Sequence, residues 1–185
     1  RLSASALSLI ASQGISVREV RRRLKVAVLS TGDEIIEPWL KAQEHQIYNS
    51  NSTALYSALK PLGFEVSYIG ILPDELGTMK EKIKALQEFD VVFTTGGVSK
   101  GEADFVEKAF RECGMDVVFH GVLVKPGRYT MMGKMGKTYV FGLPGNPLAA
   151  IVNLMYIITP YLLKLSGERS YFIDFVYAKN MQTFK

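Results

Sequence analysis

The sequence predicts an α/β domain in which mostly parallel strands are joined by helices. Two patterns indicate this class: short runs rich in β-branched apolar residues alternate with longer amphipathic runs, and glycines stand between them. The composition agrees, because 48% hydrophobic and 22% charged residues are ordinary values for a chain that folds around a core. It excludes disordered, collagen-like and coiled-coil classes, and 185 residues is the length of one domain.

The first half of the chain is expected to run helix, strand, helix, strand. Gly14 ends the first helix, and Gly63 ends the second, for which Asn51 or Ser52 supplies the N-terminal cap. The first predicted helix covers residues 3–12, and the second runs from its cap to residue 62. The predicted strands cover 25–30 and 65–71.

The second half continues this alternation and adds a hairpin. Met79, Ile83 and Leu86 share one face of a predicted helix, and an apolar central strand follows it. We expect helices over 77–89, 104–113 and 147–165, strands over 90–95 and 117–124, and a hairpin of 129–132 and 137–142 across 133–136.

Charge and cysteine usage bear on partners and compartment. Lys and Arg number 22 against 18 Asp and Glu, and the resulting +4 favours a phosphate-bearing small molecule over nucleic acid. Cys113 is the single cysteine, so no internal disulfide forms and we expect the reducing cytoplasm. The apolar stretch 149–165 is interrupted by polar residues and is shorter than the roughly 20 residues of a membrane span, so we expect a buried helix and no membrane partner.

The first predicted strand ends in an acidic loop. Ligands of open α/β sheets bind beyond the carboxyl ends of the strands. Thr31 and Gly32 bring backbone close there, and Asp33 and Glu34 supply two adjacent carboxylates, which suit a hydrated Mg²⁺. The alternative is a loop whose acidic side chains only cap a turn.

The loop after the predicted strand 90–95 carries the densest set of ligand-binding residue types. Gly96 and Gly97 lack a Cβ, so successive backbone N–H groups can turn toward a phosphate. A surface loop whose glycines serve only turn geometry is the alternative, and the pattern is neither a GxGxxG fingerprint nor a P-loop. A hydroxyl, a cation and carboxylates follow, which indicate a phosphate and metal site: Ser99, Lys100, Gly101, Glu102 and Asp104.

The segment GLPGNP forms a third candidate loop. Pro144 and Pro147 fix φ around Gly145 and present Asn146 ahead of a helix, which preorganises backbone donors. Pro147 is equally explained by the preference for proline at a helix start.

The segment VKPGRY forms a fourth. Its turn at Pro126 and Gly127 would aim Lys125 and Arg128 at phosphates, unless both cations are simply solvated.

Other reactive residue types give weaker signals. Trp39 follows Pro38 in a loop, where it suits stacking on a flat ring or ordinary packing. His45 and His120 lie far apart without a nucleophile signature, which argues against a catalytic triad.

Six motifs in order and at the expected spacing resemble those of the molybdopterin molybdenumtransferases, the family that includes the gephyrin E domain. A sister family, the molybdopterin adenylyltransferases, shares the Gly-Gly loop but continues it as TGGTG, so the transferase family fits better. The motifs are STGDE at 30–34, IYNSN at 47–51, PDE at 73–75, GGVSKGEADF at 96–105, KPG at 125–127 and GLPGNP at 142–147.

The resemblance implies a three-layer α/β/α molybdopterin-binding domain with a mostly parallel sheet. It implies insertion of molybdate into adenylylated molybdopterin, with Mg²⁺ as cofactor and release of AMP. Carried over by motif position, Glu34, Asp74 and Asp104 are the catalytic acids, and Asp33, Glu34 and Asp104 are the metal ligands. The four candidate loops, together with Asn51 of the IYNSN run, are then the substrate-binding residues.

The chain departs from the family pattern at three positions. Asn49 stands where Asp is usual, Ser52 where Arg is frequent, and Gly121 where a basic residue is common, so we expect altered nucleotide contacts and a rearranged anion pocket. Family members carry additional domains and dimerise, so we expect a homodimer in the full-length protein and an adenylyltransferase as a possible partner. We interpret residues 1–24 as an N-terminal stub with a helix and a basic linker, 25–168 as the molybdopterin-binding domain, and 169–185 as the start of a C-terminal β domain.

Three other functions stay open. A molybdopterin adenylyltransferase would consume ATP and need no molybdate, and a gephyrin-like scaffold would bind a receptor through the flanking domains. A domain of the same fold that acts on nicotinamide nucleotides would carry a different loop after the Gly-Gly pair.

Overall fold

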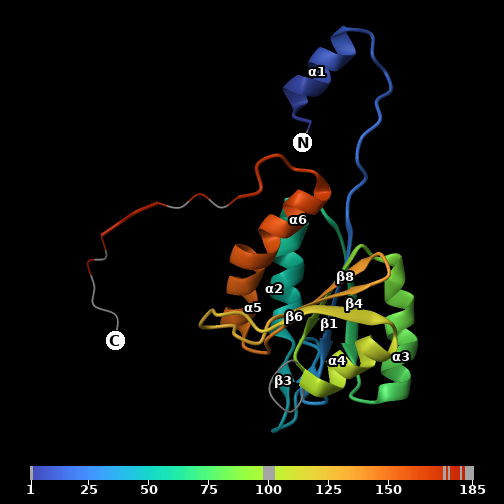
Figure 1. The fold of residues 1–185 in the computed structure, drawn as a ribbon, viewed down its shortest axis with the longest axis vertical. Coiled ribbons are helices and arrows are strands. Elements are labelled where there is room, and N and C mark those ends of the chain that lie inside the picture. The colour runs from blue at the N-terminus through green and yellow to red at the C-terminus, as the bar shows by residue number, and fades with distance from the viewer. Residues whose placement is uncertain (1, 98–102, 173, 175, 180, 182–185) are drawn as a thin grey trace.

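The computed structural model describes residues 2–97, 103–172, 174, 176–179 and 181, with the backbone alone at Ala103 and Asp104. A six-stranded sheet forms the centre, in the order β4-β1-β5-β8-β7-β6 (Figure 1). The first four strands in this order are parallel, and β7 runs antiparallel to both of its neighbours. The strand bounds are β1 Lys25–Thr31, β4 Glu65–Leu72, β5 Val91–Thr95, β6 Met115–His120, β7 Met131–Met135 and β8 Thr138–Leu143.

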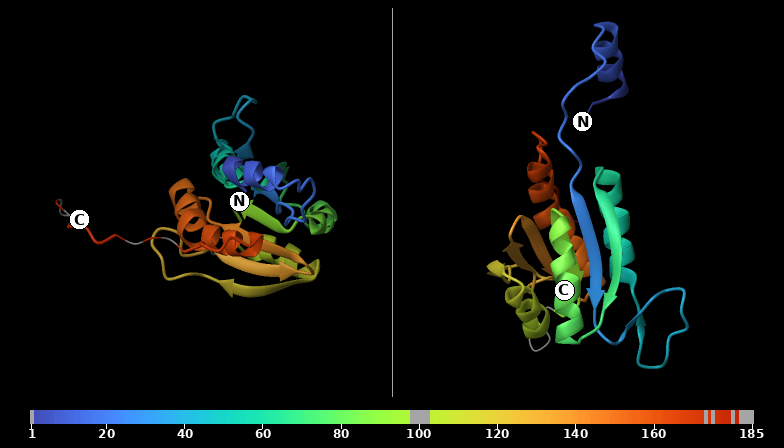
Figure 2. Two further views of the ribbon diagram at one scale, coloured as in Figure 1. Left: turned by 90° about the horizontal axis from the view of Figure 1, so that it is seen from above. Right: turned by 90° about the vertical axis from the view of Figure 1, so that its right-hand side faces the viewer.

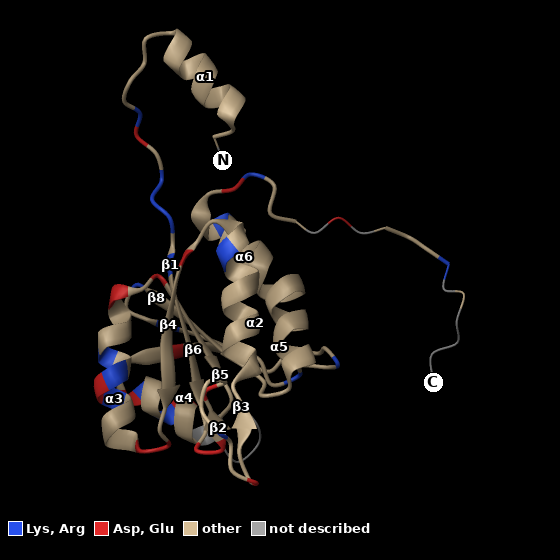
Figure 3. Ribbon diagram, turned by 180° about the vertical axis from the view of Figure 1, so that it is seen from behind, with Lys and Arg blue, Asp and Glu red and all other residues tan. Residues whose placement is uncertain are grey.

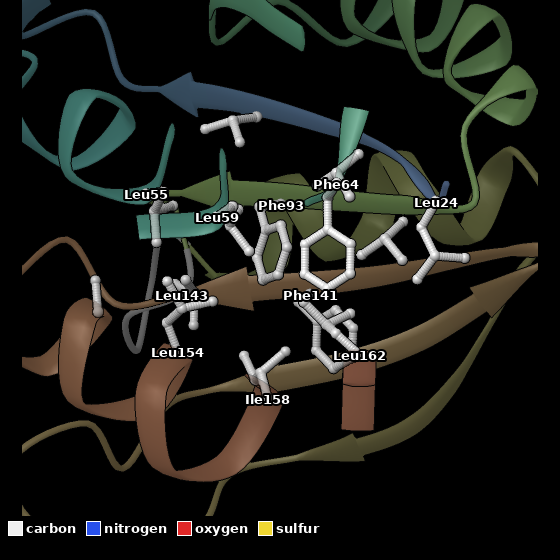
Figure 4. Close-up of a cluster of buried hydrophobic side chains, with 14 residues drawn as sticks. Leu24, Leu55, Leu59, Phe64, Phe93, Phe141, Leu143, Leu154, Ile158 and Leu162 are labelled. Atoms are coloured by element: carbon white, nitrogen blue, oxygen red, sulfur yellow. The ribbon is translucent and has the colours of Figure 1, made fainter. Parts of the chain in front are cut away.

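Helices cover both faces of this sheet, so the predicted α/β/α layering is confirmed (Figures 1 and 2). Alternate residues of each strand face opposite layers: Val26 and Val28 pack toward α2, α5 and α6, while Ala27 and Leu29 pack toward α3 and α4. Figure 4 shows the first of these cores, where Phe93 and Phe141 stack with ring centroids 5.5 Å apart. The helices are α2 Ser50–Leu59, α3 Leu76–Ala85, α4 Ala103–Glu112, α5 Pro147–Asn153 and α6 Thr159–Ser166, with short 3₁₀ turns at Lys60–Leu62 and Leu86–Glu88.

The topology brings the candidate loops to one edge of the sheet. The carboxyl ends of β4, β1, β5 and β8 share an edge because these strands are parallel. Two successive antiparallel pairings make β6 parallel to β8, so the loop that joins β6 to β7 opens at that same edge. A two-stranded ribbon of β2 (Ile35–Ile36) and β3 (Ile47–Tyr48) lies in the excursion between β1 and α2.

Every predicted strand and helix of residues 3–166 is found, with three local corrections. Asn49 caps α2 in place of Asn51 or Ser52, because its side-chain oxygen accepts the Ser52 backbone N–H at 3.2 Å. The strand predicted to reach 124 ends at His120, since Gly121 takes a φ of +106°. Gly133 lies inside β7 rather than in the turn, where the Met115 side chain packs over it and leaves no room for a Cβ.

Residues Pro147–Ser166, from α5 to α6, form one apolar helical segment of 20 residues with a mean hydropathy of 1.7. By length and composition alone, this segment could cross a membrane. The core helix of a folded domain meets the same criterion. Here Ala150, Leu154, Ile158 and Leu162 face the sheet, while Leu148, Met155 and Tyr156 are more than half exposed. The helix that was predicted to be buried is therefore buried on one face only. A π turn at Leu154–Ile158 separates α5 from α6, and the Thr159 hydroxyl donates to the Leu154 carbonyl at 2.8 Å just before Pro160, which has no N–H to give.

The terminal segments contribute little to the core. Helix α1 (Ala4–Ser12) has no buried residue and lies apart from the sheet (Figures 1 and 2). The described residues after Gly167 form no strand, although the run from Tyr171 to Ala178 has a strand-like composition. The division into three parts at 24 and 168 stays a prediction.

Candidate functional site

The end of β1 meets the Gly-Gly loop at the centre of the sheet edge where the parallel strands end. Gly96 and Gly97 have φ values of +86° and +63°. A Cβ on Gly96 would overlap the Thr31 carbonyl oxygen, and a Cβ on Gly97 would overlap the Val106 side chain and approach the Thr31 Oγ1 to 2.9 Å. Only glycine fits at either position, so β1, β5 and α4 come together closely here.

Two groups at this junction differ in how they are satisfied. The Gly96 N–H donates to the Leu143 carbonyl at 3.3 Å, so it joins β5 to β8 instead of pointing toward an anion. The Thr31 hydroxyl oxygen is buried and has no partner among the described residues. A buried hydroxyl of this kind calls for a ligand, a water or an ion.

The acidic loop after β1 approaches the loop after β4. The Asp74 backbone N–H donates to Asp33 Oδ1 at 3.4 Å, and both carboxylates lie at the surface. Glu34 folds back, with its carboxylate 2.7 Å from the position that a Cβ on Gly32 would take. Asp33 and Asp74 are therefore neighbours, while Glu34 covers the backbone of its own loop.

Several predicted site residues lie outside the described residues. They are Ser99, Lys100, Gly101 and Glu102, and also the side chain of Asp104, whose backbone lies in the first turn of α4. Within the described part of the chain, no three His, Cys, Asp or Glu side chains gather closely enough to enclose a metal ion.

The GLPGNP loop is held from two sides. The Asn51 Nδ2 donates to the Gly145 carbonyl at 2.8 Å, so α2 fixes the loop, and the Asn51 Oδ1 is buried without a described partner. The Asn146 Oδ1 accepts the Ala149 N–H at 3.1 Å and caps α5, with Pro147 as the first residue of the helix. Pro144 is half-buried between them.

The loop from β6 to β7 presents two cations and is anchored by a residue that the sequence prediction missed. Lys125 and Arg128 are exposed on either side of a cis Lys125–Pro126 bond and Gly127. The fully buried Asn153 donates from Nδ2 to the Gly127 carbonyl at 2.7 Å, and also to the Thr130 hydroxyl. A Cβ on Gly127 would overlap the Asn153 amide. The available signal was a lone asparagine within an apolar helix.

A buried polar network lies directly beneath the site. The single Ser30 hydroxyl proton goes to Asn49 Oδ1 at 2.9 Å, so the hydroxyls of Ser52, at 2.7 Å, and Thr95, at 2.8 Å, donate to Ser30. Asn49 and Ser52, two of the three departures from the family pattern, are therefore buried and occupied by protein contacts.

The same network continues to the outer strand of the sheet. The Asn49 Nδ2 donates to the Tyr68 hydroxyl at 2.8 Å, which in turn donates to Glu37 Oε1 at 2.5 Å. Burial, and after it the bond to Glu37, raises the pKa of Tyr68 well above its ordinary value. Tyr68 therefore keeps its proton at physiological pH.

A cluster of charged side chains lies between α4 and the end of β6. Glu107 on α4 accepts Arg111 Nε at 2.7 Å and lies 2.6 Å from His120 Nδ1. Partial burial opposes ionisation, but the bonds from Arg111 and His120 outweigh it and lower the pKa of Glu107. His120 thus ties β6 to α4, which gives it a structural role.

Comparison with known proteins identifies the family. Residues 27–164 match a family described as a probable molybdopterin binding domain. The chain belongs to this family. It is 40% identical over 172 residues to the molybdopterin molybdenumtransferase of Haemophilus influenzae, covering 92% of this chain and 42% of that protein. It is 30% identical over 185 residues to the same-named protein of Staphylococcus epidermidis, covering all of this chain and 44% of that one.

Solved structures agree with this assignment. The molybdopterin biosynthesis MoeA protein of Pyrococcus horikoshii superposes with a TM-score of 0.78 at 36% identity, covering 92% of this chain and 42% of that one. The chain therefore spans less than half the length of these relatives.

Proposed function

We propose that this chain is the molybdopterin-binding domain of a molybdopterin molybdenumtransferase, which binds adenylylated molybdopterin and molybdate, inserts the metal into the dithiolene and releases AMP. The observation that carries the proposal is the glycine junction of Thr31, Gly96 and Gly97, with acidic loops from β1 and β4 on the same sheet edge. Relatives that carry this name and match the chain at 30–40% identity support it.

The exposed cations suit the anionic parts of both substrates. Lys125 and Arg128 lie on the loop that opens at this edge, where they would bind phosphate or molybdate oxygens, and Asn153 holds that loop in place. Asn51 fixes the GLPGNP loop opposite. A substrate held between the two loops would have its phosphates directed at the glycine junction.

The reaction balances as a hydrolysis coupled to a ligand exchange. Water gives its OH to the phosphorus of AMP, the bond from that phosphorus to the bridging oxygen breaks, and the departing molybdopterin phosphate takes the electron pair and the remaining proton. Molybdate forms two bonds to the dithiolene sulfurs and loses one oxygen, which leaves as water with the two thiol protons. The role of Asp104, Glu34 and Asp74 would be to orient the water and the metal-bound phosphates.

The donor set fits Mg²⁺ as cofactor. Mg²⁺ usually keeps several waters and takes one or two carboxylates together with substrate phosphates, so a closed cage is not required. Asp33, Glu34 and Asp104 would supply hard oxygen ligands, and the Thr31 hydroxyl, which has no partner among the described residues, would be a further oxygen at the same strand end. When bound, the ion would neutralise charge that develops on the phosphates.

The proposed setting is cytoplasmic. The full-length protein is proposed to be a homodimer, with a molybdopterin adenylyltransferase as the source of substrate. These features rest on the family resemblance and on cysteine usage.

The test is AMP release from adenylylated molybdopterin by the purified chain with Mg²⁺, with and without molybdate. We expect molybdate-dependent release that Asp104→Asn abolishes and that Asp116→Asn, an exposed aspartate on β6, leaves unchanged. Release that requires ATP and ignores molybdate would favour the adenylyltransferase instead. Full release by Asp104→Asn would contradict the assigned role of that carboxylate.

A further inference from the structure

A pocket of about 210 Å³ opens beside the edge strand β4, between α2 and the excursion that precedes β3. Its walls carry Trp39, Tyr56 and Tyr68, and its polar rim carries Glu37 and Thr53. Pockets for whole small-molecule ligands usually enclose roughly 300–1,000 Å³. This one therefore has room for a single ring system and not for a complete nucleotide.

A local turn presents the two most distinctive groups of the pocket. The Leu40 N–H donates to the Glu37 carbonyl at 3.0 Å, and Pro38 follows Glu37 with its φ already fixed. Trp39 is held on this turn with 72% of its surface exposed. A large aromatic ring left exposed at the mouth of a pocket is a stacking surface that the fold itself does not use.

The lining of the pocket is almost entirely apolar, and Glu37 adds one acceptor, which favours a flat ligand with an N–H donor. Glu37 Oε1 is taken by the Tyr68 hydroxyl, and no donor among the described residues contacts the other carboxylate oxygen. That oxygen accepts hydrogen bonds and repels phosphate, so the pocket suits a heterocycle with N–H groups and not the charged end of the substrate.

The pocket is joined to the site through buried residues. Asn49 and Ser52 line it and hydrogen-bond to Ser30, the residue before Thr31. Tyr68 lies four residues before Leu72, the last residue of β4. It is therefore about 13 Å along the strand from the sheet edge where the parallel strands end. A substrate with its ring in the pocket and its phosphates at the glycine junction would have to span this distance past the buried side chains of Asn49 and Ser52.

We propose that this pocket binds a flat, N–H-bearing heterocycle by stacking on Trp39 and hydrogen bonding to Glu37. The ring is the adenine or the pterin of the substrate, and this identification of its source rests on the proposed function. The pocket makes Trp39, Glu37 and Tyr56 determinants of substrate binding.

The chain contains one tryptophan and nine tyrosines, so fluorescence excited selectively at tryptophan reports on the surroundings of Trp39. We would titrate the chain with AMP, with 6-hydroxymethylpterin and with ribose 5-phosphate, and measure affinities by calorimetry in parallel. We expect saturable quenching by AMP or by the pterin, whichever ring the pocket accepts, and none by ribose 5-phosphate. Absence of quenching by both ring compounds would overturn the proposal, and so would equal quenching by ribose 5-phosphate.

Variants separate stacking from nonspecific effects. Base stacking on an aromatic side chain contributes enough that Trp39→Ala should weaken binding of the quenching ring at least about fivefold, with partial recovery in Trp39→Phe. Glu37→Gln should weaken it about tenfold, because a charged acceptor is lost. Leu40→Ala, an exposed neighbour that does not line the pocket, should bind as wild type. Unchanged affinity in Trp39→Ala would refute the stacking role.

The two proposals can fail separately. Ring binding that depends on Trp39, in a chain without molybdate-dependent AMP release, would remove the proposed reaction and keep the pocket. Molybdate-dependent AMP release with the same KM in Trp39→Ala and wild type would keep the proposed reaction and remove the proposed role of the pocket.

Discussion

The two edges of the one sheet use the same residue types in opposite ways. At the edge where the parallel strands begin, Asp90 accepts both terminal nitrogens of Arg22 at 2.5 and 2.6 Å and the Lys25 backbone N–H at 2.8 Å. The Asp90 backbone N–H donates to the Lys25 carbonyl, and the Asp90 carbonyl accepts the Tyr139 backbone N–H, each at 2.9 Å. The backbone of Asp90 therefore links β1 to β8. The hydrogen bonds that this carboxylate accepts within the described residues all come from Arg22 and Lys25.

The edge where these strands end differs in both charge and geometry. Asp33, Glu34 and Asp74 lie at the surface, glycines there take positive φ values, and the Thr31 hydroxyl is buried without a described partner. Figure 3 shows acidic loops at this end of the molecule, near β2 and β3, and a basic stretch along the linker between α1 and β1. We infer that the internally bonded Asp90 serves stability, and we propose that the exposed acids beside the glycine junction serve a ligand.

The largest expected effect is that of closing the glycine junction. Gly96→Ala places a Cβ against the Thr31 carbonyl, a backbone group that cannot move aside, at a φ of +86°. We expect a loss of about 2–4 kcal/mol in the free energy of unfolding by urea denaturation. Gly136→Ala is the control, because Gly136 has a φ of +59° and a Cβ there would meet no atom within 4 Å. Its loss of unfolding free energy, about 1 kcal/mol, should reflect the backbone conformation alone. Equal losses in the two variants would contradict the close packing of the junction.

The Asn153 anchor comes next. Asn153→Leu keeps the branching and the number of heavy atoms of the side chain. It leaves the Thr130 hydroxyl without its donor and the Gly127 carbonyl with the Thr130 hydroxyl as its remaining donor. We expect a loss of about 1–3 kcal/mol in unfolding free energy, together with weaker binding of inorganic pyrophosphate measured by calorimetry. Lost stability with unchanged pyrophosphate affinity would show that the loop carrying Lys125 and Arg128 does not bind the anion.

Asp90 should affect stability alone, in a pH-dependent way. The hydrogen bond from Arg22 is the main cause of the lowered pKa of Asp90, against an ordinary value of 3.8. Because the folded-state pKa is depressed, the stabilisation is present above pH 3.8 and is lost as the pH falls through the lowered pKa. Asp90→Asn should cost about 1 kcal/mol at pH 7 and nothing at strongly acidic pH, measured by thermal unfolding, with AMP release unchanged.

The smallest effect on stability is expected at Asp33. Its carboxylate is exposed and accepts one long bond from the Asp74 N–H, so Asp33→Asn should change the unfolding free energy by less than about 0.5 kcal/mol. AMP release should fall at least tenfold at limiting Mg²⁺ and recover in part at high Mg²⁺. A stability loss as large as that of Asp90→Asn would erase the distinction between the two edges.

The sequence predicts the elements well because their signals are local. The apolar run of β1, which is buried on both faces from Val26 onward, and glycine stops such as Gly63 and Gly114 depend on nearby residues only. The hairpin turn was misplaced because Gly133 is required by Met115, 18 positions earlier, and no local pattern records that contact.

The candidate site is predicted less completely. Motif order places the loops of Thr31, Gly96 and Pro144 correctly at strand ends, since parallel strands share one edge. The engaged Gly96 N–H, the Asn153 anchor and the chain from Ser30 to Glu37 depend on side-chain contacts across the fold. Residues of that kind look unremarkable in sequence.

The most direct measurement is the amide chemical-shift change of the isotope-labelled chain on addition of inorganic pyrophosphate with Mg²⁺. We predict shifts at Gly97, Gly127 and Gly145, on the edge where the parallel strands end, and none at Lys25, Glu65 or Asp90 at the other edge. Shifts confined to the arginine-rich linker, at Arg21 and Arg23, with Gly97 unmoved would contradict the assignment of function to the strand-end edge.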